Sequence, residues 1–471
     1  MPGILDDDFY TLYGGCGKQQ QAGNRPHPAG EIDSETTGLV GKRTSRLFQK
    51  GNDSMKRSCK EIDITDWQTD YPWVLACILK HRKRHDFRML LCKIGGMQKR
   101  DYYTALQEAD KSAFEEPARN IAKEAARRIA KRRLDLKPVQ IRERVDRSSG
   151  KVRLIGKESA MQQVLDYIAK EAADEIWKRR IVPQQASSVA GRGQVYGTKM
   201  IQSWILGDNR AARWAKANGQ KYAKKCKYFV KLDVKKCYQS MRVEMFMEQF
   251  RRDCGNETLL WLWETLLKSH RVDGYEGFMI GALPSQWGCQ YIMSFIYRFA
   301  MNLYKERRGK RIRLVSHSLF YMDDILLTGS SRKDLKLAVN RITKYAWERF
   351  GLTIKPDWHI QKLEDTPIDM MGYVIHADGS ITIRPRVFLR ARRMALKSNR
   401  RQGKLCVRQA QRICSYKGYF KNSNSRKICK KLKLGAVFRG AARIVSISER
   451  RRQYDGNLQH GAGKNTVHAV A

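Results

Sequence analysis

Two apolar runs that carry acidic side chains dominate the pattern of hydrophobic and polar positions along the chain. One run covers residues 229–234 and includes Asp233, and the other covers residues 313–328 and includes Asp323 and Asp324. Short apolar runs of this kind are typical of buried strands. The pattern therefore predicts one strand that ends near Asp233 and two more that are joined by a turn at Asp323 and Asp324. This second pair of strands is predicted at residues 313–319 and 325–328.

Much of the remaining chain shows the spacing of amphipathic helices. Ile121, Ala125 and Ile129 form one apolar face, and Pro117 falls in the first turn of the same helix, a position that proline favours. Residues 141–156 differ, because two strand-like segments flank a Ser-Ser-Gly turn and predict a hairpin. The chain therefore combines predicted strands with predicted helices. Helices are predicted at residues 63–91, 102–133, 161–177, 246–267, 291–303 (with Gly309 marking the helix end), 334–350 and from 384 onward.

The charge of the chain indicates the class of its partner. The chain has 471 residues, a formal net charge of +45 and a pI near 10.1. Such a surplus indicates a polyanion, either nucleic acid or an anionic membrane. No apolar run approaches the roughly 18 residues of a membrane-spanning helix, and the positive charge is spread along the chain. The composition therefore favours nucleic acid and argues against a membrane partner.

The eleven cysteines are scattered, and none has the C-x-x-C spacing. This argues against a zinc site and against a disulfide framework, so we interpret them as reduced thiols in a cytoplasmic protein. Three aspartates at residues 6–8 argue against a signal peptide. Residues 1–54 are rich in Gly, Gln, Ser and Thr and predict a disordered leader, with Met55 as an alternative start.

The acidic residues in the apolar runs have two interpretations. A solvated Asp-Asp turn is the simpler one. However, the residues around Asp323 and Asp324 are apolar, and burying carboxylates is costly unless a partner such as a divalent metal neutralises them. Two metal ions about 4 Å apart can clamp the attacking and leaving oxygens of a phosphoryl transfer. Because such a pair needs acids from neighbouring strands, we expect Asp233 and Asp323 to lie together.

A resemblance to a known family rests on two motifs, Tyr321-Met322-Asp323-Asp324 and Leu232-Asp233-Val234-x-x-x-Tyr238. Both are similar to motifs in the palm of reverse transcriptases, and the resemblance covers residues 142 to 424. It implies a right-hand polymerase of the α+β class, with fingers, a palm of antiparallel sheet and helices, and a helical thumb. The implied divisions are a leader at 1–54, an N-terminal helical region at 55–140, fingers and palm at 141–380, a thumb at 381–450 and a loose tail at 451–471.

The resemblance also implies the chemistry of the acids, which is RNA-directed DNA synthesis from dNTPs. Asp233 and Asp323 are expected to hold two Mg²⁺ ions, with Mn²⁺ as an alternative. Asp324 would support them, and the carbonyl of Val234 would add a ligand. Tyr238 is expected to lie beneath the sugar of the incoming nucleotide and to leave no room for a 2′-hydroxyl.

Further residues of the resemblance would bind the nucleotide. Arg144 and Arg153 flank the predicted hairpin turn, like the basic residues of the fingers hairpin in retroviral relatives, and guanidinium groups bind phosphate bidentately. Most reverse transcriptases carry Gln-Gly-x-x-x-Ser-Pro where this chain has Ile-Gly-x-x-x-Ser-Gln at residues 280–286. This variant is similar to diversity-generating retroelement enzymes and implies contacts from Gly281 and Ser285. A second register, which matches a retroviral Leu-Pro-Gln-Gly motif, is also open.

Basic residues outside the palm motifs are expected to contact nucleic acid. Arg192 lies in a Gly-Arg-Gly loop, which lets the backbone approach phosphate closely and which resembles a loop of bacterial relatives that would track the template. The helical segment from residue 384 onward is strongly basic and suits a thumb that lies along a duplex. Its expected contacts are Arg390, Arg393 and Lys397.

The resemblance leaves alternatives open. Lys355 and Lys362 both stand near the position where a family lysine protonates the leaving pyrophosphate. The similar enzymes are bacterial reverse transcriptases of the group II intron-like, diversity-generating and defence-associated groups, so the role is mobility, diversification or antiviral defence. The implied partners are an RNA template (a dedicated noncoding RNA is one option), a DNA primer or product, and an accessory protein. A rival interpretation is a non-catalytic RNA-binding module similar to a maturase, against which the complete set of acids argues.

Overall fold

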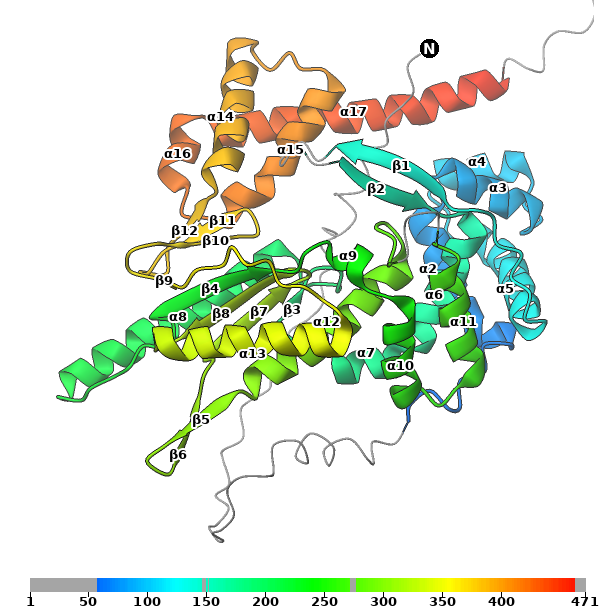
Figure 1. Cartoon of the computed structure of the whole chain (residues 1–471). Helices are drawn as coiled ribbons and strands as arrows, with labels where there is room; N and C mark the ends of the chain where they lie inside the picture. The colour runs from blue at the N-terminus through cyan, green and yellow to red at the C-terminus, as the bar shows by residue number, and fades with distance from the viewer. Residues whose placement is uncertain (1–56, 146–149, 151, 272–276, 462–471) are drawn as a thin grey trace, which may run out of the picture.

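A five-stranded sheet forms the centre of the computed structural model, which describes residues 57–145, 150, 152–271 and 277–461, with side chains to residue 448 (Figure 1). Its strands are β3 Gln185–Ala186, β4 Tyr228–Asp233, β7 His317–Tyr321, β8 Asp324–Gly329 and β9 Gln361–Lys362. They stand in the order β3-β7-β8-β4-β9. The pairings of β4, β7, β8 and β9 are antiparallel, and only β3 joins in parallel. The predicted leader lies outside the described residues.

The apolar runs become strands because helices cover both faces of the sheet. Leu319 and Leu326 are opposite each other in the β7–β8 ladder and pack with helix α8 (Gln194–Ala217) in one hydrophobic cluster. Phe320 and Ile325, the next pair, belong to the other cluster with helices α12 (Leu283–Met301) and α13 (Arg332–Phe350). Strands that are buried on both faces show continuous hydrophobic runs instead of alternation. The strand predicted at 325–328 is therefore confirmed as β8.

Two predicted boundaries are wrong. β7 begins at His317 rather than at residue 313, because Arg313 ends a separate hairpin of β5 (Tyr304–Arg307) and β6 (Lys310–Arg313). The preceding helix ends at Met301, and Gly309 lies in the turn of this hairpin. Both errors have one cause. The strands of the hairpin are almost entirely exposed, so they leave no apolar pattern in the sequence.

Helices of the N-terminal region pack into the same core as the palm. Ile121, Ala125 and Ile129 are fully buried, and Pro117 lies in the first turn of their helix, as predicted. The helix predicted at 102–133 is divided, because Ala109 adopts a left-handed backbone with φ of 58°. The predicted hairpin is confirmed in its strands, while most of its turn lies outside the described residues. The elements are α2 Trp67–His81, α3 His85–Lys93, α4 Lys99–Gln107, α5 Glu115–Ala130, β1 Gln140–Val145, β2 Val152–Lys157, α6 Ala160–Ala172, α7 Asp174–Arg180, α9 Cys237–Ser240, α10 Val243–Asp253 and α11 Glu257–Lys268.

The C-terminal helices pack around a cluster of their own, in which Ala391, Ala395 and Ile413 are buried. They stand on the same side of the palm sheet as the β1–β2 hairpin (Figure 1). The last helix continues to Gly461, so the segment predicted as a loose tail begins within a helix. The arrangement confirms the α+β class and the right-hand architecture of fingers, palm and thumb. These elements are β10 Ile368–Met370, β11 Tyr373–Ile375, β12 Ile381–Ile383, α14 Pro385–Arg400, α15 Val407–Lys421, α16 Arg426–Lys431 and α17 Leu434–Gly461.

Among the described helices, none combines the length and the apolar character that a membrane span requires.

Candidate active site

Three aspartates meet where the central strands of the palm sheet end. Asp233 is the last residue of β4, and its Cα lies opposite that of Asp324, the first residue of β8. Asp323 lies in the two-residue turn between β7 and β8, and its carbonyl accepts a hydrogen bond of 3.3 Å from the N–H of Val234. The pairing of β4 with β8 thus joins acids from distant parts of the sequence, as the two apolar runs predicted.

The turn that carries Asp323 is held by a buried glutamine. Met322 has a left-handed backbone, with φ of 56°, which a residue with a Cβ rarely adopts. Its sulfur accepts a hydrogen bond of 3.1 Å from Nε2 of Gln290, a side chain that is 1% exposed and also donates to the carbonyl of Ser187. Gln290 is not among the residues predicted from the sequence. Its one signal there is a polar position within the apolar stripe of α12.

The three carboxylates repel one another in a partly desolvated site. Burial, together with the charge of Asp233, raises the pKa of Asp323, while Arg153 and Lys355 act in the opposite direction. Asp324 is exposed at the start of β8. Even so, desolvation by the surrounding protein and the charges of Asp323 and Asp233 raise the pKa of Asp324 to about 6. Acids that raise one another's pKa are stabilised in their charged form by a nearby cation, so this arrangement favours the binding of positive charge.

Lys355 places one positive charge in the cluster. Its Nζ lies 2.5 Å from Oδ1 of Asp233, and its backbone N–H donates to the carbonyl of the same residue at 2.9 Å. The hydrogen bond to Asp233 raises the pKa of Lys355. Lys362 instead pairs with Glu364 at 3.0 Å, and its Cα lies opposite that of Tyr228, at the other end of β4. Because a strand rises about 3.3 Å per residue, its backbone is roughly 17 Å from the acids.

The donor set suits a hard divalent cation. Carboxylates and backbone carbonyls are the ligands that Mg²⁺ prefers, and Asp233, Asp323, Asp324 and the backbone of Val234 lie at one edge of the sheet. Across the described residues, no three His, Cys, Asp or Glu side chains are grouped closely enough to hold an ion. The Lys355 ammonium contacts one of the Asp233 oxygens. The mutual repulsion of the acids and their chemistry nevertheless fit metal ions held by these four residues.

The β1–β2 hairpin brings arginine to the acids. Arg153 on β2 lies close enough to Asp323 to lower the pKa of that carboxyl. The Cα of Arg153 is opposite that of Arg144 on β1, and residues opposite each other in an antiparallel ladder share one face of the hairpin. Two guanidinium groups on one face of the hairpin, of which that of Arg153 lies near Asp323, form a surface that suits phosphate.

Gly281 has a structural role in docking this hairpin. The N–H of Gly156, on β2, donates to the carbonyl of Ile280 at 2.9 Å. A Cβ on Gly281 would lie 2.8 Å from the carbonyl oxygen of Gly156, and Gly281 has a φ of +112°, which side chains rarely allow. A larger residue at this position would push β2, and Arg153 with it, away from the acids.

Ser285 and Tyr238 differ in their access to the site. Ser285 is 0% exposed in the first turn of α12, and its Oγ makes no hydrogen bond to any described residue. Tyr238 is half-buried in α9, which begins four residues after the end of β4, and its carbonyl accepts an N–H bond of 2.8 Å from Phe278. A Cβ on Gly277 would lie 2.6 Å from the same carbonyl. Tyr238 is thus fixed close to the end of β4, whereas Ser285 is enclosed beneath the loop.

The predicted nucleic-acid contacts lie on two elements. Arg192 donates from Nη1 to the carbonyl of Val182 at 2.8 Å, so its guanidinium also stabilises its own loop. Arg390, Arg393 and Lys397 lie on α14, which buries Ala391, Ala395 and Ser398 on its other face. Arg393 and Lys397 are exposed, and Arg390 is half-buried. The thumb therefore presents a basic helix on the side of the palm where the fingers hairpin stands.

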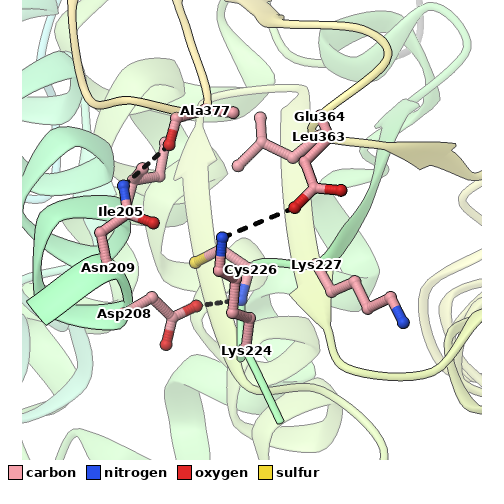
Figure 2. A pocket seen from close by; sticks show the side chains of 9 residues that line it. All are labelled: Ile205, Asp208, Asn209, Lys224, Cys226, Lys227, Leu363, Glu364 and Ala377. Atoms are coloured by element: carbon pink, nitrogen blue, oxygen red, sulfur yellow. Dashed lines mark hydrogen bonds and ion pairs between the residues drawn. The ribbon is translucent and has the colours of Figure 1, made fainter. Parts of the chain in front are cut away.

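A small pocket at the edge of the palm sheet contains none of the three aspartates (Figure 2). Its polar groups pair with one another. Asp208 accepts a hydrogen bond of 2.6 Å from the N–H of Cys226, and Lys224 lies 3.6 Å from Glu364. We assign it a structural role, joining α8 to the segments before β4 and after β9. The lining residues are Ile205, Asp208, Asn209, Lys224, Cys226, Lys227, Leu363, Glu364 and Ala377.

The part of the chain that carries the three aspartates is similar to a known protein family. Residues 145–375 match the family described as reverse transcriptase (RNA-dependent DNA polymerase). No curated protein matches the chain. The solved structure of apo telomerase from Candida tropicalis, truncated from its C-terminal domain, is 12% identical with a TM-score of 0.35, and the alignment covers 73% of this chain and 87% of that chain. Apo telomerase from the same organism is 10% identical with a TM-score of 0.32, covering 87% and 84%.

The raised pKa of Asp324 predicts a pH-dependent effect on stability. The carboxyl titrates at about 6 in the folded protein, against an ordinary value of 3.8. The protonated carboxyl therefore favours the folded state. The free energy of unfolding falls as the pH rises from the lower of these two values to the higher. We expect Asp324→Asn to stabilise the metal-free protein relative to wild type at about pH 8, and to have little effect at about pH 4. Thermal unfolding in EDTA measures the difference.

Asp378 provides a control in which the pKa shift has the opposite sign, because hydrogen bonds from Ser380 lower the pKa of that carboxyl. Asp378→Asn is expected to lower stability at the higher pH. A gain for Asp324→Asn that is the same at both pH values would contradict the assigned repulsion.

Proposed function

We propose that the reverse transcriptase domain formed by residues 145–375 copies RNA into DNA by two-metal nucleotidyl transfer. The protein is an RNA-directed DNA polymerase, a nucleotidyltransferase. The mechanism is supported by one observation above all, the meeting of Asp233, Asp323 and Asp324 at one edge of the palm sheet, with Arg153 beside them. Phosphoryl transfer mainly requires acids that hold metal ions and a cation that holds phosphate.

Asp233 and Asp323 would hold two Mg²⁺ ions, or Mn²⁺ in their place, with Asp324 and the carbonyl of Val234 completing the ligands. When bound, such ions lower the pKa of the primer 3′-hydroxyl and neutralise the triphosphate. The contribution of the chain is to fix the acids before the substrate arrives. The β4–β8 ladder fixes their backbones, and the hydrogen bond from Gln290 fixes the turn.

The fingers hairpin would bind the triphosphate of the incoming nucleotide through Arg144 and Arg153. This assignment is supported by the closeness of Arg153 to Asp323 and by its position opposite Arg144. Gly281 would keep the hairpin docked against the palm, and Ser285 would support the same loop from below.

Lys355 would be the general acid that donates a proton from Nζ to the leaving pyrophosphate. Of the two candidate lysines, it is the one in contact with Asp233, while Lys362 is paired at the far end of β4. A protonated amine with a raised pKa carries its proton throughout the neutral range, as a general acid must.

Tyr238 would select deoxynucleotides by steric exclusion of the 2′-hydroxyl. It lies in α9, five residues after Asp233, and its backbone is fixed by Phe278 and by the close approach of Gly277. A side chain on so rigid a support can exclude one additional oxygen atom.

For the biological setting, we propose a bacterial enzyme of the group II intron-like, diversity-generating or defence-associated groups, on the strength of its Ile-Gly-x-x-x-Ser-Gln motif. Its template would be an RNA, including a dedicated noncoding RNA, its primer or product would be DNA, and an accessory protein would assist it. Arg192, Arg390, Arg393 and Lys397 would lie along the duplex.

Ten free cysteines in the described residues suit the bacterial cytoplasm. Primer extension by wild type and by Asp323→Asn distinguishes this proposal from the alternative, a non-catalytic RNA-binding module.

The first test removes one metal-binding charge without changing the size of the side chain. Asp323→Asn should reduce extension of a DNA primer on an RNA template to background, because the metal pair would lose a ligand. Primer extension with dNTPs and Mg²⁺ measures this. Asp365→Asn, an exposed acid outside the cluster, is the matched control and should extend normally. Extension that survives in Asp323→Asn would place the active site elsewhere.

The second test separates the two lysines. Lys355→Leu should lower the maximal rate of single-nucleotide addition by about 10²- to 10⁴-fold, the usual contribution of a general acid, and should leave the KM for dNTP nearly unchanged. Lys362→Leu should behave like wild type. Rapid-quench kinetics of one addition measures both constants. Equal losses in the two variants, or a loss confined to KM, would remove Lys355 from this role.

The third test concerns the sugar. Tyr238→Ala should raise ribonucleotide incorporation far more than it lowers the use of dNTPs, because space opens beneath the sugar. Tyr238→Phe keeps the ring and should keep the discrimination. The ratio of kcat/KM for dNTP and rNTP decides the matter. If this ratio is unchanged in Tyr238→Ala, another residue excludes the 2′-hydroxyl.

A further inference from the structure

The β5–β6 hairpin carries a concentration of positive charge that the proposed active site does not use. Six of the ten residues from Tyr304 to Arg313 are basic, and Glu306 is the one acid. All of them except Lys305 are exposed. The basic residues are Lys305, Arg307, Arg308, Lys310, Arg311 and Arg313.

The hairpin stands at the end of the palm sheet opposite the acids. β6 ends shortly before β7 begins at His317, and β7 then runs to Tyr321, next to the turn of Asp323. At about 3.3 Å per residue the strand alone separates the base of the hairpin from the acids by more than 10 Å. The hairpin also projects away from the fingers and the thumb (Figure 1). It therefore cannot help to hold a primer end at the acids.

The hairpin is a two-stranded ribbon with a tight turn at its tip and an ion pair at its base. Arg308 and Gly309 both have positive φ, 51° and 71°, as in the tight two-residue turns that match the twist of a hairpin. The guanidinium of Arg311 lies 3.5 Å from the centre of the Tyr304 ring. At the base, Lys305 Nζ lies 2.5 Å from Oδ1 of Asp334 on α13. The ribbon is thus tied to the palm at its base.

The charges at the tip do not serve the folding of the hairpin. Arg307 and Lys310 are directly opposite each other in the ladder, and like charges in that position are destabilising. Two-stranded hairpins are marginal even without such repulsion. Among the residues that the structure describes, Arg307, Arg308 and Lys310 have no acidic partner within ion-pair distance. An external anion would offset the repulsion.

We propose that the β5–β6 hairpin is a second nucleic-acid-binding surface, which holds a base-paired region of RNA outside the catalytic site. The proposal rests on the proposed function, because an RNA template extends beyond the few nucleotides at the acids. Four of the six cations are arginines, whose planar groups bind phosphate bidentately. Duplex RNA is recognised mainly through its phosphates, its sugars and its shape. Tyr304 and Ile312, at 39% and 38% exposure, offer too little apolar surface for membrane insertion.

The test compares two RNA probes that share one template–primer and differ in a base-paired stem added to the template. The stem should increase the affinity of wild type, and Arg307→Gln/Arg308→Asn/Lys310→Gln should lose most of that increase. Asn followed by Gly suits the tight turn, so this variant keeps the hairpin fold, and its thermal midpoint verifies this. Lys99→Gln/Arg100→Gln/Lys111→Gln removes the same charge from exposed positions of the N-terminal region and is the matched control.

Fluorescence anisotropy against salt concentration gives the number of phosphate contacts. For the stem probe, the log–log slope of the hairpin variant should be smaller than that of wild type by about 2 to 3, at 0.7 to 0.9 per phosphate. On the probe without the stem, its affinity and its single-nucleotide addition should match wild type. The control variant should keep the full gain from the stem.

Three outcomes would overturn the proposal: an unchanged slope in the hairpin variant, an equal loss in the control variant, or hairpin-dependent binding to phosphatidylserine vesicles with no effect of the stem. Nucleotide addition by wild type on the stem-less probe tests the proposed function separately. Its absence would refute that function, while the stem-dependent binding would still decide the role of the hairpin.

Discussion

The interaction on which the rest of the structure depends is the repulsion among three carboxylates that the palm sheet holds together. Asp233 and Asp324 are opposite each other in one ladder, and Asp323 lies in the adjoining turn. The strands behind them are buried on both faces, so the acids cannot separate without exposing the core. Burial and, after it, this repulsion raise the pKa of Asp323 and of Asp324. Positive charge is what can relieve it, whether from metal, from lysine or from arginine.

The surrounding elements bring cations to this point by backbone contacts. Lys355 arrives because the segment around it pairs with the end of β4. Arg153 arrives because the hairpin docks on the loop at Gly281, where only a glycine allows the close approach to Gly156. Backbone contacts thus hold both residues near the acids, and the side chain of Lys355 also pairs with Asp233. The charge of the β5–β6 hairpin belongs to a different surface, at the opposite end of the same strands.

Much of the fold and the outline of the site could be predicted from the sequence, for a physical reason. Strands buried on both faces must be continuously apolar, so an acid at the end of such a run is conspicuous, and Asp233, Asp323 and Asp324 were found in this way. Helices with one buried face, such as the one with Ile121 and Ile129, show their period directly. The exposed hairpin at residues 304–313 was missed, because a segment with no buried face has no such pattern.

The sequence by itself determined which acids stand at the ends of the apolar strands, that the chain combines helices with strands, and the partner class implied by a net charge of +45. Only the tertiary structure decided between Lys355 and Lys362 as neighbours of Asp233, because β-strand pairing places one at each end of β4. It also enclosed Ser285 and revealed Gln290 beneath the turn. Composition and periodicity can be determined from the sequence directly. The contacts between β4, β8 and α12 join residues that are far apart in the sequence, and they form only when these elements bury a common core.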